Sequence, residues 1–193
     1  MLTHKGTQTL ATARLTLRRF TVEDADEMYK NWANDARVTR FLTWQPHTSP
    51  EQTKHLLTLW VSEYEKTDKY NWVIEFEHKA IGNISVVLCE EQSEVAHLGY
   101  CIGFDTWGKG IMTEAVRAVI DYLFSEVGFH RITICHALKN PASGKVAQKC
   151  GLTLEGTRRD AFKNFEGEFL DICDYGILRP EWEAKARVDD VVL

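Results

Sequence analysis

The sequence predicts an α/β fold in which helices connect the strands of one mixed sheet. Segments with alternating apolar and polar residues, typical of strands, are interleaved with segments whose apolar residues recur every three or four positions, typical of helices. One strand–helix–strand unit between residues 94 and 136 has the spacing of a crossover connection, so its two strands should be parallel. With 193 residues, of which 44% are hydrophobic, the chain can bury a sizeable core, and we expect a single domain over residues 1–193.

The first third of the chain is predicted to hold one strand and two helices. Arg14–Phe20 alternates and indicates a strand, and Thr21 is a candidate N-cap with Asp24 three residues later. Val38–Thr48 is irregular and is interpreted as a loop. Ser49, followed by a proline and then a capping-box glutamine, should begin the second helix.

The rest of the chain is richer in strands. Asn140 should cap a helix that ends at Gly151, and another helix should end at Gly128. Six strands are predicted, the first two as a hairpin and the last two as a closing antiparallel pair: Trp72–Phe76, Ala80–Leu88, Glu94–Ile102, Arg131–His136, Leu152–Arg158 and Phe169–Leu178.

The composition excludes several classes of partner. A net charge of −5 argues against nucleic acid or an anionic membrane and is compatible with an amine-bearing substrate. The five cysteines are widely spaced without a Cys-x-x-Cys pair, which favours reduced thiols over disulfides or a zinc site, so no metal is expected. We find no apolar run of transmembrane length, and Met1–Ala13 lacks the apolar stretch of a secretion signal. A cytoplasmic protein is expected.

The stretch Trp107–Glu114 is a short glycine-containing turn that opens a helix. Gly108 and Gly110 allow backbone N–H groups to point the same way, and the first turn of the helix adds its own unpaired donors and positive dipole end. Such a place binds anions, phosphate above all. The spacing differs from the dinucleotide fingerprint and from the Walker loop, so a plain tight turn remains the alternative.

Three motifs together resemble the GNAT superfamily of acetyl-CoA-dependent N-acetyltransferases, in particular its RimJ/RimL-like branch, which includes ribosomal-protein N-terminal acetyltransferases. The motifs are Leu98–Ile102 before Trp107–Gly110, then Thr113–Ala115, and then Asn140-x-x-Ser143 with Lys149-x-Gly151. The resemblance covers residues 14–182. It implies a mostly antiparallel twisted sheet with helices on both faces and a parallel central pair of strands that splay apart to hold acetyl-CoA.

The resemblance also implies the residues that bind the cofactor. Backbone groups of one strand should contact the pantetheine arm, main-chain N–H groups of the glycine turn should hold the pyrophosphate, and the segment from Asn140 should complete the site. The residues so assigned are Tyr100, Ile102, Gly103, Trp107, Gly108, Lys109, Gly110, Ile111, Met112, Thr113, Asn140 and Ser143. Trp107 stands where the family often has Gln or Arg, so the contact there should differ.

The proton donor to the CoA thiolate is the main departure from the family pattern. Many members carry a tyrosine seven residues after the asparagine, whereas this chain has Ala147. Ser143 is the nearest replacement, as in the RimL-like branch; otherwise it is a helix residue with a local hydrogen bond. His97 stands where related sequences often carry a glutamate, so it is the candidate base; a structural histidine is the alternative.

The acceptor site is built from the least patterned segments. Trp44 and His47 are candidates for its wall and Tyr175 for a substrate contact, although all three also fit loop or core positions. Cys101 should lie near the thioester, but direct attack of an amine needs no acyl-enzyme, so this thiol is interpreted as packing.

The predicted function is acetyl transfer from acetyl-CoA to a primary amine, by a monomer or homodimer, with a protein N-terminus as one candidate acceptor. A small-molecule acetyltransferase acting on a polyamine, an antibiotic or an amino acid is the alternative within enzymes. A non-catalytic acyl-CoA sensor is the alternative outside them, because the usual tyrosine is absent.

Overall fold

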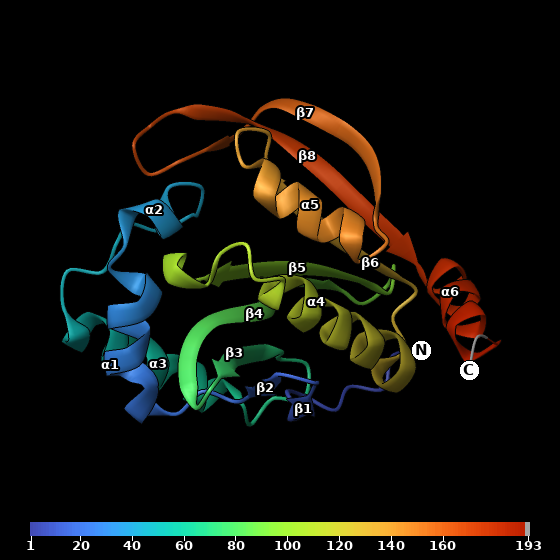
Figure 1. Ribbon diagram of the computed structural model, residues 1–193, viewed down its shortest axis with the longest axis horizontal. Coiled ribbons are helices and arrows are strands. Elements are labelled where there is room, and N and C mark those ends of the chain that lie inside the picture. The colour runs from blue at the N-terminus through green and yellow to red at the C-terminus, as the bar shows by residue number, and fades with distance from the viewer. Residues whose placement is uncertain (192–193) are drawn as a thin grey trace.

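The computed structural model describes residues 1–191, and an eight-stranded sheet forms its centre (Figure 1). The strand order is β1-β2-β3-β4-β5-β6-β8-β7, and every neighbouring pair is antiparallel except β5 and β6, which are parallel. The predicted mixed, mostly antiparallel sheet is therefore confirmed. The strands are β1 (Leu10–Ala11), β2 (Leu15–Arg18), β3 (Asn71–Phe76), β4 (Lys79–Glu90), β5 (Val95–Ile102), β6 (Arg131–Ala137), β7 (Thr153–Lys163) and β8 (Phe169–Leu178).

Helices cover both faces of the sheet, because neighbouring residues of a strand pack into two different cores. Trp72 and Ile74 lie in a core with α4 and α5, whereas Val73 between them lies in a second core with α1 and α3.

Among the described residues, no helix is both long enough and apolar enough to cross a membrane. The helices are α1 (Ala25–Met28), α2 (Ala36–Thr39), α3 (Pro50–Glu63), α4 (Ile111–Tyr122), α5 (Pro141–Lys149) and α6 (Arg179–Val191), with short 3-10 or π segments η1 (Val22–Asp24), η2 (Tyr29–Ala33), η3 (Phe104–Thr106) and η4 (Leu123–Val127).

The parallel pair β5 and β6 is joined for only half of its length. Val95 to Leu98 pair with residues of β6, whereas Gly99–Ile102 continue β5 without a β6 partner among the described residues. On the far side β6 pairs along its whole length with β8. The two strands therefore separate toward their carboxyl ends, where ligands bind in open α/β sheets.

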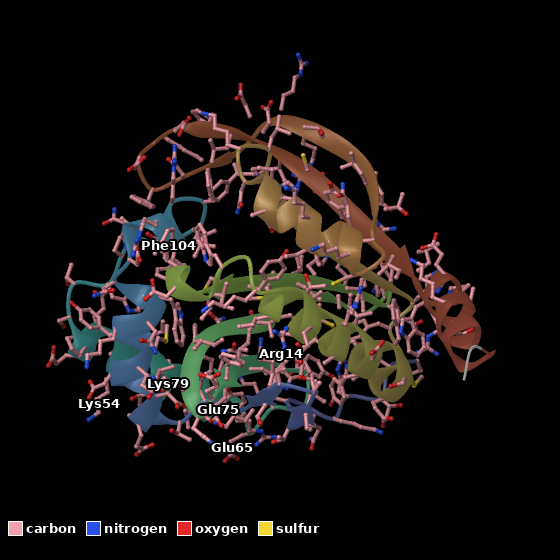
Figure 2. The ribbon with its side chains drawn as sticks, in the orientation of Figure 1. Arg14, Lys54, Glu65, Glu75, Lys79 and Phe104 are labelled. Atoms are coloured by element: carbon pink, nitrogen blue, oxygen red, sulfur yellow. The ribbon has the colours of Figure 1, made fainter. Side chains whose placement is uncertain are left out.

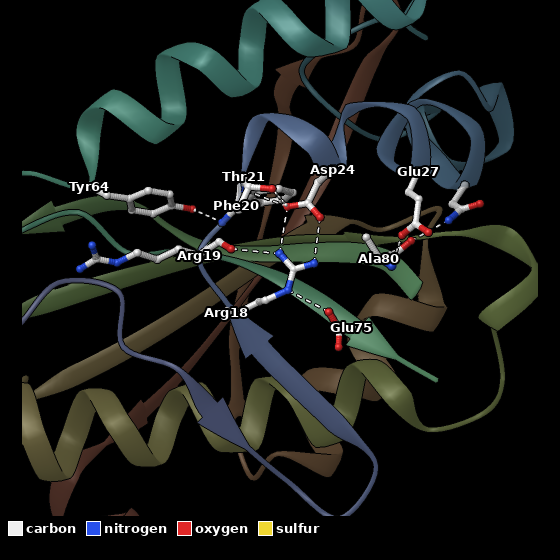
Figure 3. Close-up of polar contacts among 10 residues, drawn as sticks. Arg18, Arg19, Phe20, Thr21, Asp24, Glu27, Tyr64, Glu75 and Ala80 are labelled. Carbon is white, nitrogen blue, oxygen red and sulfur yellow. Dashed lines mark hydrogen bonds and ion pairs between the residues drawn. The ribbon is translucent and has the colours of Figure 1, made fainter. Parts of the chain in front are cut away.

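A charged cluster ties the amino-terminal strand to the helical layer (Figure 3). The guanidinium of Arg18 donates two hydrogen bonds to Asp24, of 2.9 and 2.8 Å, and one of 2.8 Å to Glu75 on β3. Asp24 also accepts from the backbone N–H of Thr21 at 2.7 Å, so the predicted capping pair is present. Burial alone would raise the pKa of Asp24, but the bonds from Arg18 and Thr21 outweigh it and leave that pKa below its ordinary value.

The segment after Asp35 departs from the prediction. We predicted an irregular Val38–Thr48, but Val38 and Thr39 belong to the short helix α2, so that prediction is wrong there. The carboxylate of Asp35 accepts a 2.9 Å bond from the backbone N–H of Arg37 and so caps the helix. A single helical turn is too short to show a 3.6-residue period, which explains why the sequence pattern missed it.

Candidate active site

A cavity of about 460 Å³ lies at the opening between β5 and β6. Its wall is formed by the end of β5, the glycine turn, the first turn of α4, one side of α5 and the segment around α2. Ten of the twelve residues predicted to contact the cofactor line it: Tyr100, Ile102, Trp107, Gly108, Gly110, Ile111, Met112, Thr113, Asn140 and Ser143. The topology thus gathers segments that are distant in the chain, from Arg37 to Lys149.

The glycine turn has the backbone conformation that the motif requires. Gly108 and Gly110 both have φ near 75°, where a β-branched side chain would be strained, and α4 starts at the next residue, Ile111. Arg14 supports the turn from outside: its guanidinium donates to the carbonyl of Lys109 at 3.1 Å and to Glu114 at 2.7 Å. The N–H groups that open α4 therefore lie on a fixed backbone at the predicted anion site.

Cationic side chains surround this anion site. Lys145 and Lys149, one turn apart on α5, line the cavity. A second cavity of about 750 Å³ shares Gly110 and Lys149 with the first, and Arg117 also lines it. The cofactor residues assigned from the sequence did not include these two lysines or Arg117, although Lys149 belongs to the third motif and the four-residue spacing of the lysines on a predicted helix was an available signal.

The helix α5 presents Asn140 and Ser143 to the cavity. Asn140 occupies the N-cap position, but within the described residues its side chain makes no capping hydrogen bond. The helix can pack closely on β6 because residue 144 is glycine: a Cβ there would come within 2.6 Å of Nε2 of His136. This close packing places Ser143 beside the opening between the strands.

Tyr100 and Ser143 are joined by a hydrogen bond across the cavity wall. The two hydroxyl oxygens are 2.8 Å apart, and the Tyr100 hydroxyl also lies 3.3 Å from the carbonyl oxygen of Ser143. Burial raises the pKa of Tyr100, and the bond to Ser143 offsets only part of that rise, so the phenol stays protonated at neutral pH.

Two of the residues predicted to bind the cofactor have polar groups that form hydrogen bonds within the protein. The indole Nε1 of Trp107 donates a 2.9 Å bond to the carbonyl of Ile102, and the N–H of Gly103 donates a 2.8 Å bond to the carbonyl of Ile81. Gly103 and Lys109 lie outside the cavity lining. Trp107 thus makes a structural contact at the position where the family often has Gln or Arg.

A further part of the cavity wall comes from the segment around α2, most of which the sequence analysis interpreted as a loop. Arg37, Val38, Phe41 and Leu42 line the cavity. The guanidinium of Arg37 lies 3.8 Å from the ring centroid of Phe104, whose position is shown in Figure 2.

The three candidate acceptor residues lie outside the cavity lining: His47 and Tyr175 are buried, and Trp44 is half-buried. Trp44 packs against the second core, and His47 is buried beside it with Nδ1 2.7 Å from Oγ1 of Thr53. Tyr175 is 5% exposed beneath α5, where its hydroxyl accepts a bond from Gln148. Their assignment to the acceptor site stays a prediction.

His97 lies in the closed half of β5, away from the cavity lining. Its position in the strand is three before Tyr100, so the two side chains point to opposite faces of the sheet. Its Nε2 is 2.6 Å from Glu90 on β4 and its Nδ1 is 2.7 Å from the hydroxyl of Thr133 on β6. Its assignment as the base therefore also stays a prediction.

Cys101 lines the cavity, but its thiol is in a poor environment for a nucleophile. Burial raises its pKa to about 12, and the sulfur donates to Oδ1 of Asn83 at 2.9 Å. A thiol with so high a pKa carries almost no thiolate at neutral pH. This agrees with its interpretation as a packing residue.

A family model for the acetyltransferase (GNAT) domain matches residues 14–153 of the chain. The chain belongs to the GNAT acetyltransferase family. Membership confirms the predicted acyltransferase activity, the GNAT fold and acetyl-CoA as the co-substrate.

Individual relatives support the RimJ/RimL-like branch. The chain is 28% identical to the N-acetyltransferase p20 of Bacillus licheniformis over 91% of this chain and 98% of the relative. It is 27% identical to the ribosomal protein uS5-alanine N-acetyltransferase of Escherichia coli over 90% of this chain and 92% of the relative. Among solved structures, RimL, a ribosomal L7/L12 alpha-N-protein acetyltransferase in complex with coenzyme A, superposes with a TM-score of 0.81 at 22% identity, over 89% of this chain and 98% of RimL.

Proposed function

We propose that this protein transfers the acetyl group of acetyl-CoA to the N-terminal amine of a protein substrate. The observation that supports it is the single cavity that combines the glycine turn, the open end of β5 and the hydroxyl of Ser143. The pyrophosphate would lie on the N–H groups of the turn and of α4, and the acetyl end would lie between the strands, near Ser143. The ribosomal-protein substrates of the E. coli relative and of RimL support a protein N-terminus as the acceptor.

The roles follow from the chemistry of the reaction. The free amine attacks the thioester carbon, and the C–S bond breaks with its electron pair on sulfur. Ser143 donates a hydrogen bond to the departing thiolate, which acquires the proton that the acceptor nitrogen loses. Holding both reactants in line supplies much of the rate, and donors aimed at the developing charge supply the rest.

The test is a screen of acceptors with release of free thiol as the readout. Peptides with the N-terminal sequences of ribosomal proteins are compared with the same peptides carrying a blocked N-terminus, and with polyamines, aminoglycosides and amino acids. We expect turnover with free peptide N-termini and none with the blocked ones. Turnover with small amines and with none of the peptides would contradict a protein N-terminus as the acceptor and indicate a small-molecule acetyltransferase. Acetyl-CoA binding without turnover on any amine would indicate a sensor.

A further inference from the structure

Tyr100 brings a phenol hydroxyl to the residue that the proposed mechanism places at the leaving thiolate. Both of the hydrogen bonds described for this hydroxyl go to Ser143, at 2.8 Å to its side chain and 3.3 Å to its carbonyl. We propose that Tyr100 is a positioning residue, whose hydroxyl orients the Ser143 hydroxyl toward the sulfur of CoA. This inference rests on the proposed function, of which it specifies one part.

The number of hydrogens on the two hydroxyls determines how the pair works. Each carries one hydrogen, so the 2.8 Å bond uses either that of Tyr100 or that of Ser143. If Tyr100 donates to Oγ of Ser143, the serine hydrogen points into the cavity. If Ser143 donates instead, Tyr100 can donate only to the more distant carbonyl. A thiolate in the cavity accepts the serine hydrogen and so selects the first arrangement, in which each bond polarises the next.

The burial of Tyr100 suits this role. A phenol whose pKa is raised does not give its proton away, so it serves as a lasting hydrogen-bond donor. The proton that sulfur gains is the one lost by the acceptor nitrogen, so both hydroxyls end the reaction unchanged.

The structure also explains why this phenol comes from β5. The helix position at which many GNAT members carry tyrosine is Ala147, and its methyl group is fully buried in the core with α4. The hydroxyl that meets Ser143 arrives instead from the opposite wall of the opening, on the part of β5 that lacks a β6 partner among the described residues.

The test uses the pKa of the thiol of bound CoA, which requires neither an acceptor nor turnover. CoA labelled with carbon-13 next to sulfur is titrated by NMR in complex with the wild type, Tyr100→Phe, Ser143→Ala and the double variant. We expect Tyr100→Phe to raise the pKa of the bound thiol by about half a unit to one unit, a three- to tenfold loss of thiolate stabilisation. In the Ser143→Ala background the same change should have no effect, because Tyr100 acts through Ser143.

Cationic residues of the wall, Lys145, Lys149 and Arg37, also favour the thiolate, but they are the same in all four proteins. Tyr29→Phe is the matched control, since that hydroxyl lies at Thr48, outside the cavity. An unchanged thiol pKa in Tyr100→Phe would overturn the inference. An equal effect of Tyr100→Phe with and without the serine hydroxyl would overturn it too.

Kinetics give the second readout on any acceptor that turns over. Tyr100→Phe should lower kcat about tenfold and leave KM for acetyl-CoA within about twofold, whereas a residue that only packs against the cofactor would change KM. If no amine is acetylated while the thiol titration behaves as expected, the proposed function fails and the positioning role of Tyr100 stands.

Discussion

The Arg18 cluster and the Tyr100–Ser143 pair are both polar networks between elements distant in sequence, but they differ in what surrounds them. In the Arg18 cluster, defined by Arg18, Asp24 and Glu75, each charged group faces a partner of opposite charge inside the protein (Figure 3). The Tyr100–Ser143 pair borders the cavity that the end of β5 and the first turn of α4 line. Under the proposed function, the Arg18 cluster serves stability and the Tyr100–Ser143 pair serves catalysis, so substitutions in the two places should affect different measurements.

The largest effect on stability is expected from Asp24→Ala. The carboxylate is 8% exposed, and its removal leaves Arg18 with Glu75 alone and the Thr21 N–H without its acceptor. Removing one partner of a buried pair costs about 3 kcal/mol. Chemical denaturation at pH 7 measures the loss, and acetyl-CoA affinity should stay within about twofold at temperatures where the variant is folded.

This prediction has a matched control and a pH signature. Glu63→Ala removes an exposed pair with Lys66 and should cost less than about 0.5 kcal/mol. Because the pKa of Asp24 is lowered on folding, its contribution is complete above the unfolded value, near 3.9, and disappears as the pH falls through the folded one. The difference in stability between wild type and Asp24→Ala should therefore shrink only below about pH 4. A constant difference down to pH 2 would contradict the role of the charge.

Ser143→Ala, in contrast to Asp24→Ala, should lower activity and leave stability nearly unchanged. Loss of the donor to the thiolate should lower kcat by about 100-fold, while the melting temperature and the affinity for acetyl-CoA change little. Ser62→Ala removes a hydroxyl that bonds the carbonyl of Leu59 on the exposed face of α3 and serves as the control. Normal turnover in Ser143→Ala would show that the Ser143 hydroxyl has no role in catalysis.

Gly110→Val should weaken binding of acetyl-CoA at least tenfold, or about 1.4 kcal/mol. A β-branched residue is strained at a φ of 75°, and its Cβ would lie 3.8 Å from the guanidinium of Arg14, so the turn that should hold the phosphates would be distorted. Gly167→Val, at a φ of 87° in the β7–β8 connection, carries a similar strain outside the cavity lining. Calorimetric titration of both variants with acetyl-CoA separates general backbone strain from a local effect on the cofactor site. Equal affinity for acetyl-CoA in the two variants would contradict the assignment of the glycine turn to the cofactor site.

The sequence predicted the parts of the fold and site that carry strong local patterns. The parallel pair follows from the strand–helix–strand order, and the glycine turn and the helix from Asn140 line the same cavity. The wall at Arg37–Leu42 was missed because α2 is one turn long and its side chains become neighbours of the cavity only through tertiary packing. The Arg18 cluster was missed for a similar reason, since its carboxylates come from two elements 51 residues apart.

The placement of His97 was predictable from the strand itself. Side chains alternate along β5, so residues 97 and 100 cannot share a face, and His97 points away from the face on which Tyr100 meets Ser143. Proximity in sequence to the Leu98–Tyr100 motif is therefore weak evidence for proximity to the acetyl group.

The smallest effect on catalysis is expected from His97→Gln. The imidazole bridges Glu90 on β4 and Thr133 on β6, like the paired groups of the Arg18 cluster, and it stands outside the cavity lining. Glutamine can still bond both neighbours, so kcat/KM at pH 7.5 should fall less than about threefold. The acidic limb of the pH profile should persist in His97→Gln, because the ionisation of the substrate amine produces it.

A second variant, His97→Ala, removes the bridge between Glu90 and Thr133 altogether. It should lower the melting temperature but give the same kcat/KM and pH profile as His97→Gln. Catalysis by His97 as the base predicts the reverse: a loss of about 100-fold in His97→Gln and disappearance of the acidic limb. Measuring kcat/KM from pH 5.5 to 9 for the wild type and both variants decides between a structural and a catalytic role of His97. Loss of the acidic limb in His97→Gln would show that His97 acts as the base.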